Sequence, residues 1–175
     1  MIRGEKVYLR VVTEADLALL SAWWNDADFK SEYNSFGLQP ANTIEKHFAE
    51  NGLLSSQQGD LLIVTSNNDD IIGSISYRQV KYGPNEGSAA FNIGISIAAM
   101  HRGKGYGVEA QKLLASYLLA TYPVMRIEAS TDRENIAEQR ALEKAGFTRE
   151  GVLRQAQWRT GSRHDLVVYS KLRGE

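Results

Sequence analysis

Hydrophobic residues alternate with polar ones along several segments of the chain, which is typical of β-strands. The alternation is clearest at Ala89–Ile97, where the odd-numbered positions from Phe91 onward are apolar and the intervening ones are Asn, Gly and Ser. Leu61–Thr65 and Ile71–Val80 flank a polar Asn-Asn-Asp-Asp turn and therefore predict a hairpin. Further strands are predicted at Val7–Val12, Arg126–Thr131, Phe147–Arg154 and Leu166–Leu172.

A second pattern has the period of an α-helix. Apolar residues between Ala110 and Leu118 recur on one face of such a helix. Asn135–Ala145 also has a helical pattern, and Gly146 follows it at the position of a C-terminal cap. Two further helices are predicted nearer the N-terminus, over about 13–26 and 43–52.

The order of these elements indicates the fold class. Strand, helix and strand follow one another between residues 89 and 131, and such a unit implies a locally parallel pair inside a mixed sheet. The pattern predicts an α+β (mixed α/β) fold with one sheet and helices on both faces. Because the 175 residues contain no linker and no repeat, we expect a single domain spanning residues 1–175.

Composition excludes several chemistries. The chain has no cysteine, so we expect no disulfide, no thiolate metal ligand and no enzyme-bound thioester. His47, His101 and His164 lack ligand spacing, so no metal site is expected. The net charge of −1 argues against nucleic-acid and membrane partners. The N-terminus lacks an apolar signal segment and no apolar run approaches ~18 residues, which predicts a cytoplasmic protein.

A glycine-rich loop, Arg102–Gly107, lies between the strand at 89–97 and the amphipathic helix. Alternating glycines let backbone N–H groups approach a ligand, and the following helix N-terminus favours negative charge. Arg102 and Lys104 add positive charge, so the loop is predicted to bind an anion such as a pyrophosphate. It matches neither the P-loop pattern nor the dinucleotide pattern, whose third glycine would come one residue later. The alternative interpretation is a tight strand-to-helix turn with incidental charges.

The pattern R-x-x-G-x-G in this loop, between a strand and an amphipathic helix, resembles the acyl-CoA motif of the GNAT N-acetyltransferases. Asn135–Phe147 resembles the second signature of that family. It is closest to the form N-x-x-S-x-R-x-L-E-K-x-G-F of the ribosomal-protein N-acetyltransferase (RimJ/RimL-like) branch. Glu150–Arg154 is similar to the E-G-x-x-R of the same branch. The similarity extends over nearly the whole chain in order and spacing.

The resemblance implies one mixed sheet of about six to seven strands that splays apart between its fourth and fifth strands, here Ala89–Ile97 and Arg126–Thr131. It implies that acetyl-CoA binds between these strands as a co-substrate. The pyrophosphate would lie on the glycine-rich loop and the pantetheine arm along the first of the two strands. The implied cofactor-binding residues are Ile95, Ser96, Ile97, Arg102, Gly103, Lys104, Gly105, Tyr106, Gly107, Asn135 and Arg140.

The same resemblance implies direct acetyl transfer to a primary amine in a ternary complex, which agrees with the absence of cysteine. The amine must first lose a proton, because a lysine-type amine has a pKa of ~10.4 and an α-amine one of ~7.7–8.0. A carboxylate could accept that proton, and a backbone N–H near Ile95 or Ile97 would stabilise the oxyanion. The acceptor would be a protein N-terminal α-amine or a small-molecule amine, and the protein a monomer or a homodimer.

Three positions depart from the family pattern. Many GNAT enzymes have a Tyr as general acid where Leu142 stands, and the branch has Ser where Glu138 stands and often Glu where Gln157 stands. Because Leu and Gln cannot exchange a proton at neutral pH, acid and base do not follow from the resemblance. Glu138, one turn into its helix, is the first candidate base, and Glu128 is the second. The alternatives are a first-turn glutamate that stabilises the helix dipole and a paired strand residue.

The acceptor side offers less evidence. Acidic residues outnumber the single base, Lys30, between residues 13 and 32, and such a neighbourhood suits a cationic acceptor as well as a solvated helix face. Two other function classes stay open: a catalytically weak CoA-binding or regulatory module of the same fold, suggested by Leu142 and Gln157, and a nucleotide-binding protein that uses the loop differently. The acidic residues are Glu14, Asp16, Asp26, Asp28 and Glu32.

Overall fold

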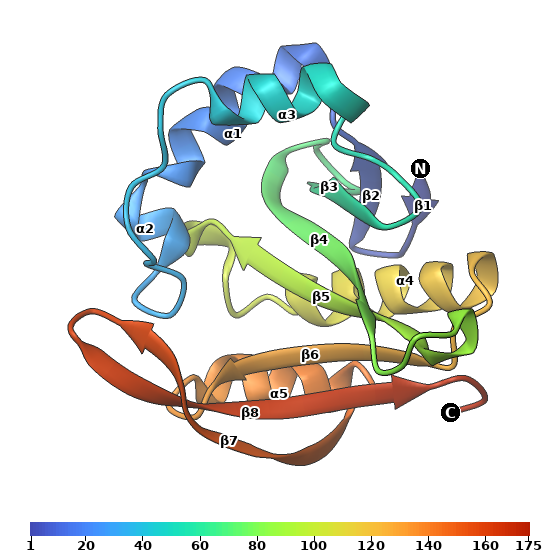
Figure 1. The fold of residues 1–175 in the computed structure, drawn as a ribbon. Helices are drawn as coiled ribbons and strands as arrows, with labels where there is room; N and C mark the ends of the chain where they lie inside the picture. The colour runs from blue at the N-terminus through green and yellow to red at the C-terminus, as the bar shows by residue number, and fades with distance from the viewer.

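One eight-stranded sheet runs through the computed structural model, which describes residues 1–175, and helices cover both of its faces (Figure 1). The strand order is β1-β2-β3-β4-β5-β6-β8-β7, with β5 and β6 parallel and the other neighbours antiparallel. The predicted mixed sheet is confirmed, with eight strands in place of six to seven. The elements are β1 (Ile2–Arg3), β2 (Val7–Val11), α1 (Leu17–Trp24), α2 (Ala27–Lys30), α3 (Thr43–Asn51), β3 (Gln58–Thr65), β4 (Ile71–Lys81), β5 (Ala89–Ile97), α4 (Tyr106–Thr121), β6 (Arg126–Asp132), α5 (Ile136–Lys144), β7 (Thr148–Arg159) and β8 (Ser162–Leu172).

Successive side chains of β3 lie on opposite faces of the sheet, and each face has its own hydrophobic cluster. Leu61 and Ile63 belong to a hydrophobic cluster that includes residues of α4 and α5, and Leu62 and Val64 belong to a second cluster with residues of α1 and α3. Because successive side chains of a strand point to opposite faces, a strand that is apolar at every position needs a helical layer on each side. None of these helices is both long and apolar enough to cross a membrane.

The start of α1 is fixed by a carboxylate. Asp16 accepts hydrogen bonds from the backbone N–H and the hydroxyl of Thr13, at 2.8 and 2.7 Å, and both terminal nitrogens of Arg10 donate to it at 2.7 Å. The Arg10 guanidinium holds the pKa of Asp16 well below its ordinary value. The chain therefore turns from β2 into a short 3₁₀ turn and α1 at the place that the Thr13 and Asp16 pattern predicts.

The parallel pair β5 and β6 forms a wedge. Only two residue pairs join these strands, Phe91 with Ile127 and Asn92 with Glu128, and beyond them the strands diverge. From the end of β5 the chain passes through the glycine-rich loop into α4 and returns as β6. The predicted splay is thus present and opens toward the carboxyl end of β5, where Ile95 to Ile97 lack a partner on the β6 side.

The C-terminal hairpin is longer than predicted. Its strands, β7 and β8, extend to a turn at Thr160 and Gly161, both with positive φ, whereas the predicted strands stopped at Arg154 and resumed at Leu166. The extra residues of β8, Ser162 to Asp165, are all polar. Those of β7 alternate between polar and apolar, but the two apolar residues, Ala156 and Trp158, are exposed, so the pattern does not mark a buried face. Pairing with β8 extends β7 there, although the register shifts between Leu153 and Gln157.

Candidate active site

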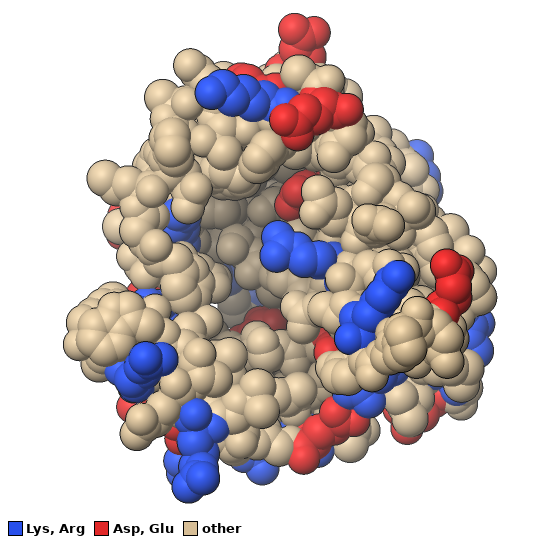
Figure 2. Space-filling model, viewed as in Figure 1, with Lys and Arg blue, Asp and Glu red and all other residues tan.

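The wedge opens into a groove of about 720 Å³. Its walls come from the end of β5, the glycine-rich loop, the first turns of α5 and the segment 27–34 that contains α2. Figure 2 shows the molecule deeply hollowed in its centre, between the part that carries α1 to α3 and the part that carries β6 to β8. A second cavity of about 110 Å³ lies deeper in the wedge and shares Tyr33, Asn34, Ile95, Asn135 and Glu138 with the groove.

The glycine-rich loop is built to receive an anion. Gly103 and Gly105 have φ of +75° and +84°, which side chains rarely tolerate. Gly107 is the second residue of α4, and the ends of Ile95 and Ile97 lie against it. None of the N–H groups of residues 103–108 donates a hydrogen bond within the protein. Six consecutive free donors at a helix N-terminus match the geometry that binds phosphate oxygens.

The sequence of the loop suggests that Arg102 and Lys104 are both directed toward a bound anion, but their side chains are not both so placed. The Arg102 guanidinium donates to the carbonyl oxygen of Ile97 at 2.8 Å and to those of Asp28 and Phe29 at 2.9 and 3.1 Å. Arg102 thereby ties the loop and β5 to α2 through Nε and Nη2, and its Nη1 group is left without a partner within the protein. Neither Lys104 nor Tyr106 lines the groove, and Tyr106 packs against the hydrophobic core.

Other cations lie close to the groove. Arg140 and Lys144, one turn apart on α5, line its wall, and Arg140 was among the predicted cofactor-binding residues. Lys6 comes from the turn before β2, and its Nζ donates to the carbonyl oxygen of Lys104 at 3.3 Å. Sequence analysis missed Lys6 and Lys144, because nothing in the local sequence relates the N-terminal turn or the end of α5 to the loop.

The exposed edge of β5 offers backbone groups to an extended ligand. Ala98 N–H donates to the Ile72 carbonyl of β4 at 2.9 Å. Antiparallel pairing alternates along a strand, so the N–H and C=O groups of Ile95 and Ile97 point away from β4 and toward the wedge. An arm with amide groups can pair there as an added strand. Ile95, Ser96 and Ile97, three of the residues predicted to bind the cofactor, all line the groove.

Glu138 lies where the groove meets the smaller cavity. Asn135 begins α5 and accepts the Glu138 N–H with its side-chain oxygen at 3.2 Å, which fixes the first turn. The Glu138 carboxylate accepts one hydrogen bond, from the amide of the buried Gln111 at 2.5 Å, and forms no ion pair. Burial raises the pKa of Glu138 to about 7, and the Gln111 hydrogen bond offsets only part of that rise.

Gln111 is a functional candidate that the sequence analysis did not identify. It lies on the face of α4 that is buried, at 1% exposure, and its side-chain oxygen is buried without a hydrogen-bond partner. A sequence signal exists, since Gln111 is the one polar residue among the buried positions of α4, which are Ala110, Gln111, Leu114, Ala115 and Leu118.

The other candidate base, Glu128, is outside the site. It lies where β5 and β6 are still paired, and it lines neither the groove nor the smaller cavity. Its carboxylate accepts hydrogen bonds from Arg126 Nε at 2.5 Å and from the Tyr82 hydroxyl at 2.7 Å. This is the paired strand residue that sequence analysis gave as the alternative. Leu142 is fully buried in the hydrophobic core.

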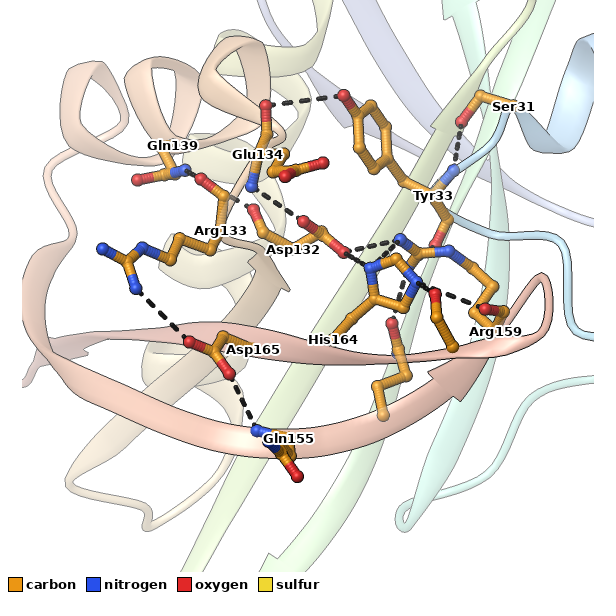
Figure 3. A network of polar contacts seen from close by, with 12 residues as sticks. Ser31, Tyr33, Asp132, Arg133, Glu134, Gln139, Gln155, Arg159, His164 and Asp165 are labelled. Atoms are coloured by element: carbon orange, nitrogen blue, oxygen red, sulfur yellow. Dashed lines mark hydrogen bonds and ion pairs between the residues drawn. The ribbon is translucent and has the colours of Figure 1, made fainter.

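A buried ion pair closes the open end of the wedge (Figure 3). Arg159, at the end of β7, donates to Asp132 of β6 at 2.5 Å, to the Tyr33 carbonyl at 3.2 Å and to the Gln157 side-chain oxygen at 2.6 Å. His164 Nδ1 lies 3.1 Å from the same Asp132 carboxylate. Burial alone would raise the pKa of Asp132, but the Arg159 guanidinium, the Glu134 N–H and the nearby His164 together outweigh it and the pKa is lowered. The pair joins three distant segments around the smaller cavity.

The fold agrees with the comparisons to known proteins. The sequence profile of the acetyltransferase (GNAT) domain matches residues 6–148. The chain is similar to the probable N-acetyltransferase YjcK of Bacillus subtilis, at 32% identity over 164 residues, which cover 89% of this chain and 87% of the relative. The chain therefore belongs to the GNAT family of acetyltransferases. It is an acyl-CoA N-acetyltransferase, and the predicted fold is confirmed.

Proteins with the same fold and a solved structure are described as acting on different acceptors. The spermidine N-acetyltransferase of Vibrio cholerae, solved with CoA and spermine, superposes with a TM-score of 0.80 at 17% identity over 95% of each chain. The Salmonella typhimurium acetyltransferase that modifies the N-terminal serine of ribosomal protein L7/L12 superposes at 0.78 and 20% identity, covering 97% of this chain and 96% of that one. At such identities the likeness shows the fold, and the acceptor has to be inferred from the site.

Proposed function

We propose that this chain transfers the acetyl group of acetyl-CoA directly to a primary amine, either a protein N-terminal α-amine or a small-molecule amine, as in the RimJ/RimL-like branch. The observation that carries this proposal is the position of Glu138, a half-buried carboxylate without a counterion at the junction of a groove and a small cavity. The groove suits a long, phosphate-bearing ligand because it combines the free N–H groups of residues 103–108 with the open edge of β5.

The residues around the junction supply the chemistry of transfer. Glu138, with a pKa of about 7, is ionised in about half of the molecules at neutral pH and can take the proton of an incoming ammonium group. The N–H groups of Ile95 and Ile97 point into the wedge and can stabilise an oxyanion that forms beside β5. Arg140 and Lys144 add positive charge to the wall that would face the phosphates.

The test has two parts. Acetyl-CoA at about 100 times its dissociation constant should raise the melting temperature, since it adds roughly 2.7 kcal/mol to stability. A thiol-release assay should then detect turnover with at least one member of a panel of free amino acids, polyamines, aminoglycosides and peptides with free N-termini. A shift with NAD or ATP but not with acetyl-CoA would contradict the groove assignment. Binding of acetyl-CoA without turnover of any amine would favour the CoA-binding module.

A further inference from the structure

The side-chain amide of Gln157 has a defined orientation. Its oxygen lies 2.6 Å from Arg159 Nη1. Arginine carries five N–H donors and no acceptor, so the atom of the amide that faces it must be the oxygen. The NH₂ group of Gln157 consequently points the other way, and it donates to no acceptor within the protein.

Arg159 cannot turn to release this amide. It is 4% exposed, and its side chain is held by the buried carboxylate of Asp132 and by the carbonyl oxygen of Tyr33 (Figure 3). The ring of Tyr33 lies 5.7 Å from the guanidinium carbon. A flipped Gln157 amide would place its NH₂ against the guanidinium, so the orientation is enforced by a pair that is itself fixed.

The NH₂ group, which is turned away from Arg159, is the polar group that Gln157 can offer to the smaller cavity. Gln157 lines that cavity together with Glu138, and no lysine or arginine does so. Asp132 also lines the cavity, but its carboxylate is already paired with Arg159. The other polar residues of the lining carry hydroxyls or side-chain amides, which both donate and accept and so do not by themselves select the polarity of a ligand; they are Tyr33, Asn34, Gln111, Ser130, Thr131 and Asn135. The cavity therefore presents a carboxylate on one wall and an oriented donor on another.

The cavity is small. Its volume of about 110 Å³ corresponds to three or four water molecules, at about 30 Å³ each. A ligand that uses both Glu138 and Gln157 has its amine and its second polar group only a few atoms apart. At the Gln157 wall a second ammonium group would meet an N–H donor with the Arg159 guanidinium behind it, whereas a carbonyl or hydroxyl oxygen would accept a hydrogen bond.

We propose that Gln157 determines acceptor specificity, and that it selects primary amines with a hydrogen-bond-accepting oxygen on a neighbouring carbon, such as 2-amino carbonyl compounds and 2-amino alcohols, over simple alkylamines and short diamines. This proposal rests on the proposed function, because it takes the smaller cavity as the place of the acceptor amine. One neutral hydrogen bond of this kind changes selectivity by about five- to tenfold.

The experiment measures kcat/KM by thiol release for four acceptors of similar size: glycinamide, ethanolamine, propylamine and ethylenediamine, each corrected for its free-base fraction. The wild-type protein should prefer glycinamide and ethanolamine over propylamine by about five- to tenfold, and ethylenediamine should be the poorest acceptor. In Gln157→Met, which keeps the length of the side chain, the preference over propylamine should fall to within about twofold. Gln157→Glu should favour ethylenediamine, because a carboxylate then faces the second ammonium group.

Gln155→Met is the matched control, since Gln155 is an exposed residue of the same strand and lines neither cavity, and its acceptor preferences should equal those of the wild type. Equal kcat/KM of the wild type for glycinamide and propylamine would overturn the proposal, and that result needs no variant to fold. An unchanged preference in Gln157→Met would do the same. If the wild type turns over no amine at all, the proposed function itself fails, and this inference with it.

Discussion

Glu128 and Glu138 are two glutamates at opposite ends of the same wedge, the first buried and the second half-buried, and their surroundings differ. Glu128 lies where β5 and β6 are paired, and its carboxylate is held by Arg126 and by the Tyr82 hydroxyl. Glu138 lies where the strands have separated, and its carboxylate has one amide donor and no cation. Both are removed from solvent at least in part, and the main difference lies in the counterion.

This difference separates a structural carboxylate from a reactive one. The carboxylate of Glu128 is occupied by its two donors, Arg126 and the Tyr82 hydroxyl, and lines neither cavity, so it is not available to a substrate. A buried carboxylate without a counterion retains its proton up to higher pH, and the pKa of about 7 lets Glu138 take up and release a proton under working conditions. The following substitutions test this comparison, starting with the largest expected effect.

Glu138→Gln should lower kcat by about 10²- to 10⁴-fold, because the amide cannot accept the proton of the amine. Wild-type kcat/KM should rise as pH increases through about 7, and the variant should lack this rise. The measurement is a thiol-release pH profile, with acetyl-CoA affinity from thermal shift as the control, which should change by less than about threefold. If the variant keeps the rise near pH 7 and most of its turnover, Glu138 is not the base.

Glu128→Gln should lower the stability of the fold and leave turnover nearly unchanged. We expect a loss of about 2 kcal/mol in the free energy of unfolding, since the buried end of the Arg126 ion pair loses its charge while Arg126 keeps its second partner, Glu150, at 2.6 Å. Turnover at 25 °C should stay within about twofold of the wild type. Denaturant unfolding and the same thiol-release assay provide both values. A large loss of kcat in a folded Glu128→Gln protein would mean that Glu128 also takes part in the reaction, and would contradict the comparison with Glu138.

The last expected effect is on the pH dependence of stability. The folded-state pKa of Glu138 lies above its ordinary value of 4.5, so its ionisation destabilises the fold progressively as pH rises from about 4.5 to about 7. The stability of Glu138→Gln relative to the wild type should therefore be greater at pH 8 than at pH 5 by about 2 kcal/mol. Melting curves of the two proteins at both pH values test this. A stability difference that is the same at pH 5 and pH 8 would contradict the raised pKa.

Most of the fold could be predicted from the local pattern of apolar and polar residues along the chain. The alternation in β5 and the apolar face of α4 come from the period of side chains along one element, and both elements were predicted close to their observed limits. The ends of β7 and β8 were missed, because pairing between the strands extends them and not burial of a face. The two-residue strand β1 is too short to have a period.

The site was less accessible to sequence reasoning. Glycines with positive φ and the residues at the end of β5 follow from the loop motif and are found in the groove. The direction of a long side chain depends on partners far along the chain, however. Arg102 turns to the carbonyls of α2, more than 70 positions away, and the orientation of Gln157 requires Asp132 and Tyr33 to fix Arg159 first.

The position of β8 in the sheet has a consequence for folding. This strand follows β7 in the chain but lies between β6 and β7, so Arg126 pairs with Leu172. The antiparallel neighbours β2 to β5 can assemble while the chain is still being synthesised, whereas β6 and β7 have no strand between them until residues 162–172 have left the ribosome. The wall of the groove formed by β5 and α4 is therefore expected to mature first, and the wall that carries Gln157 and Arg159 last.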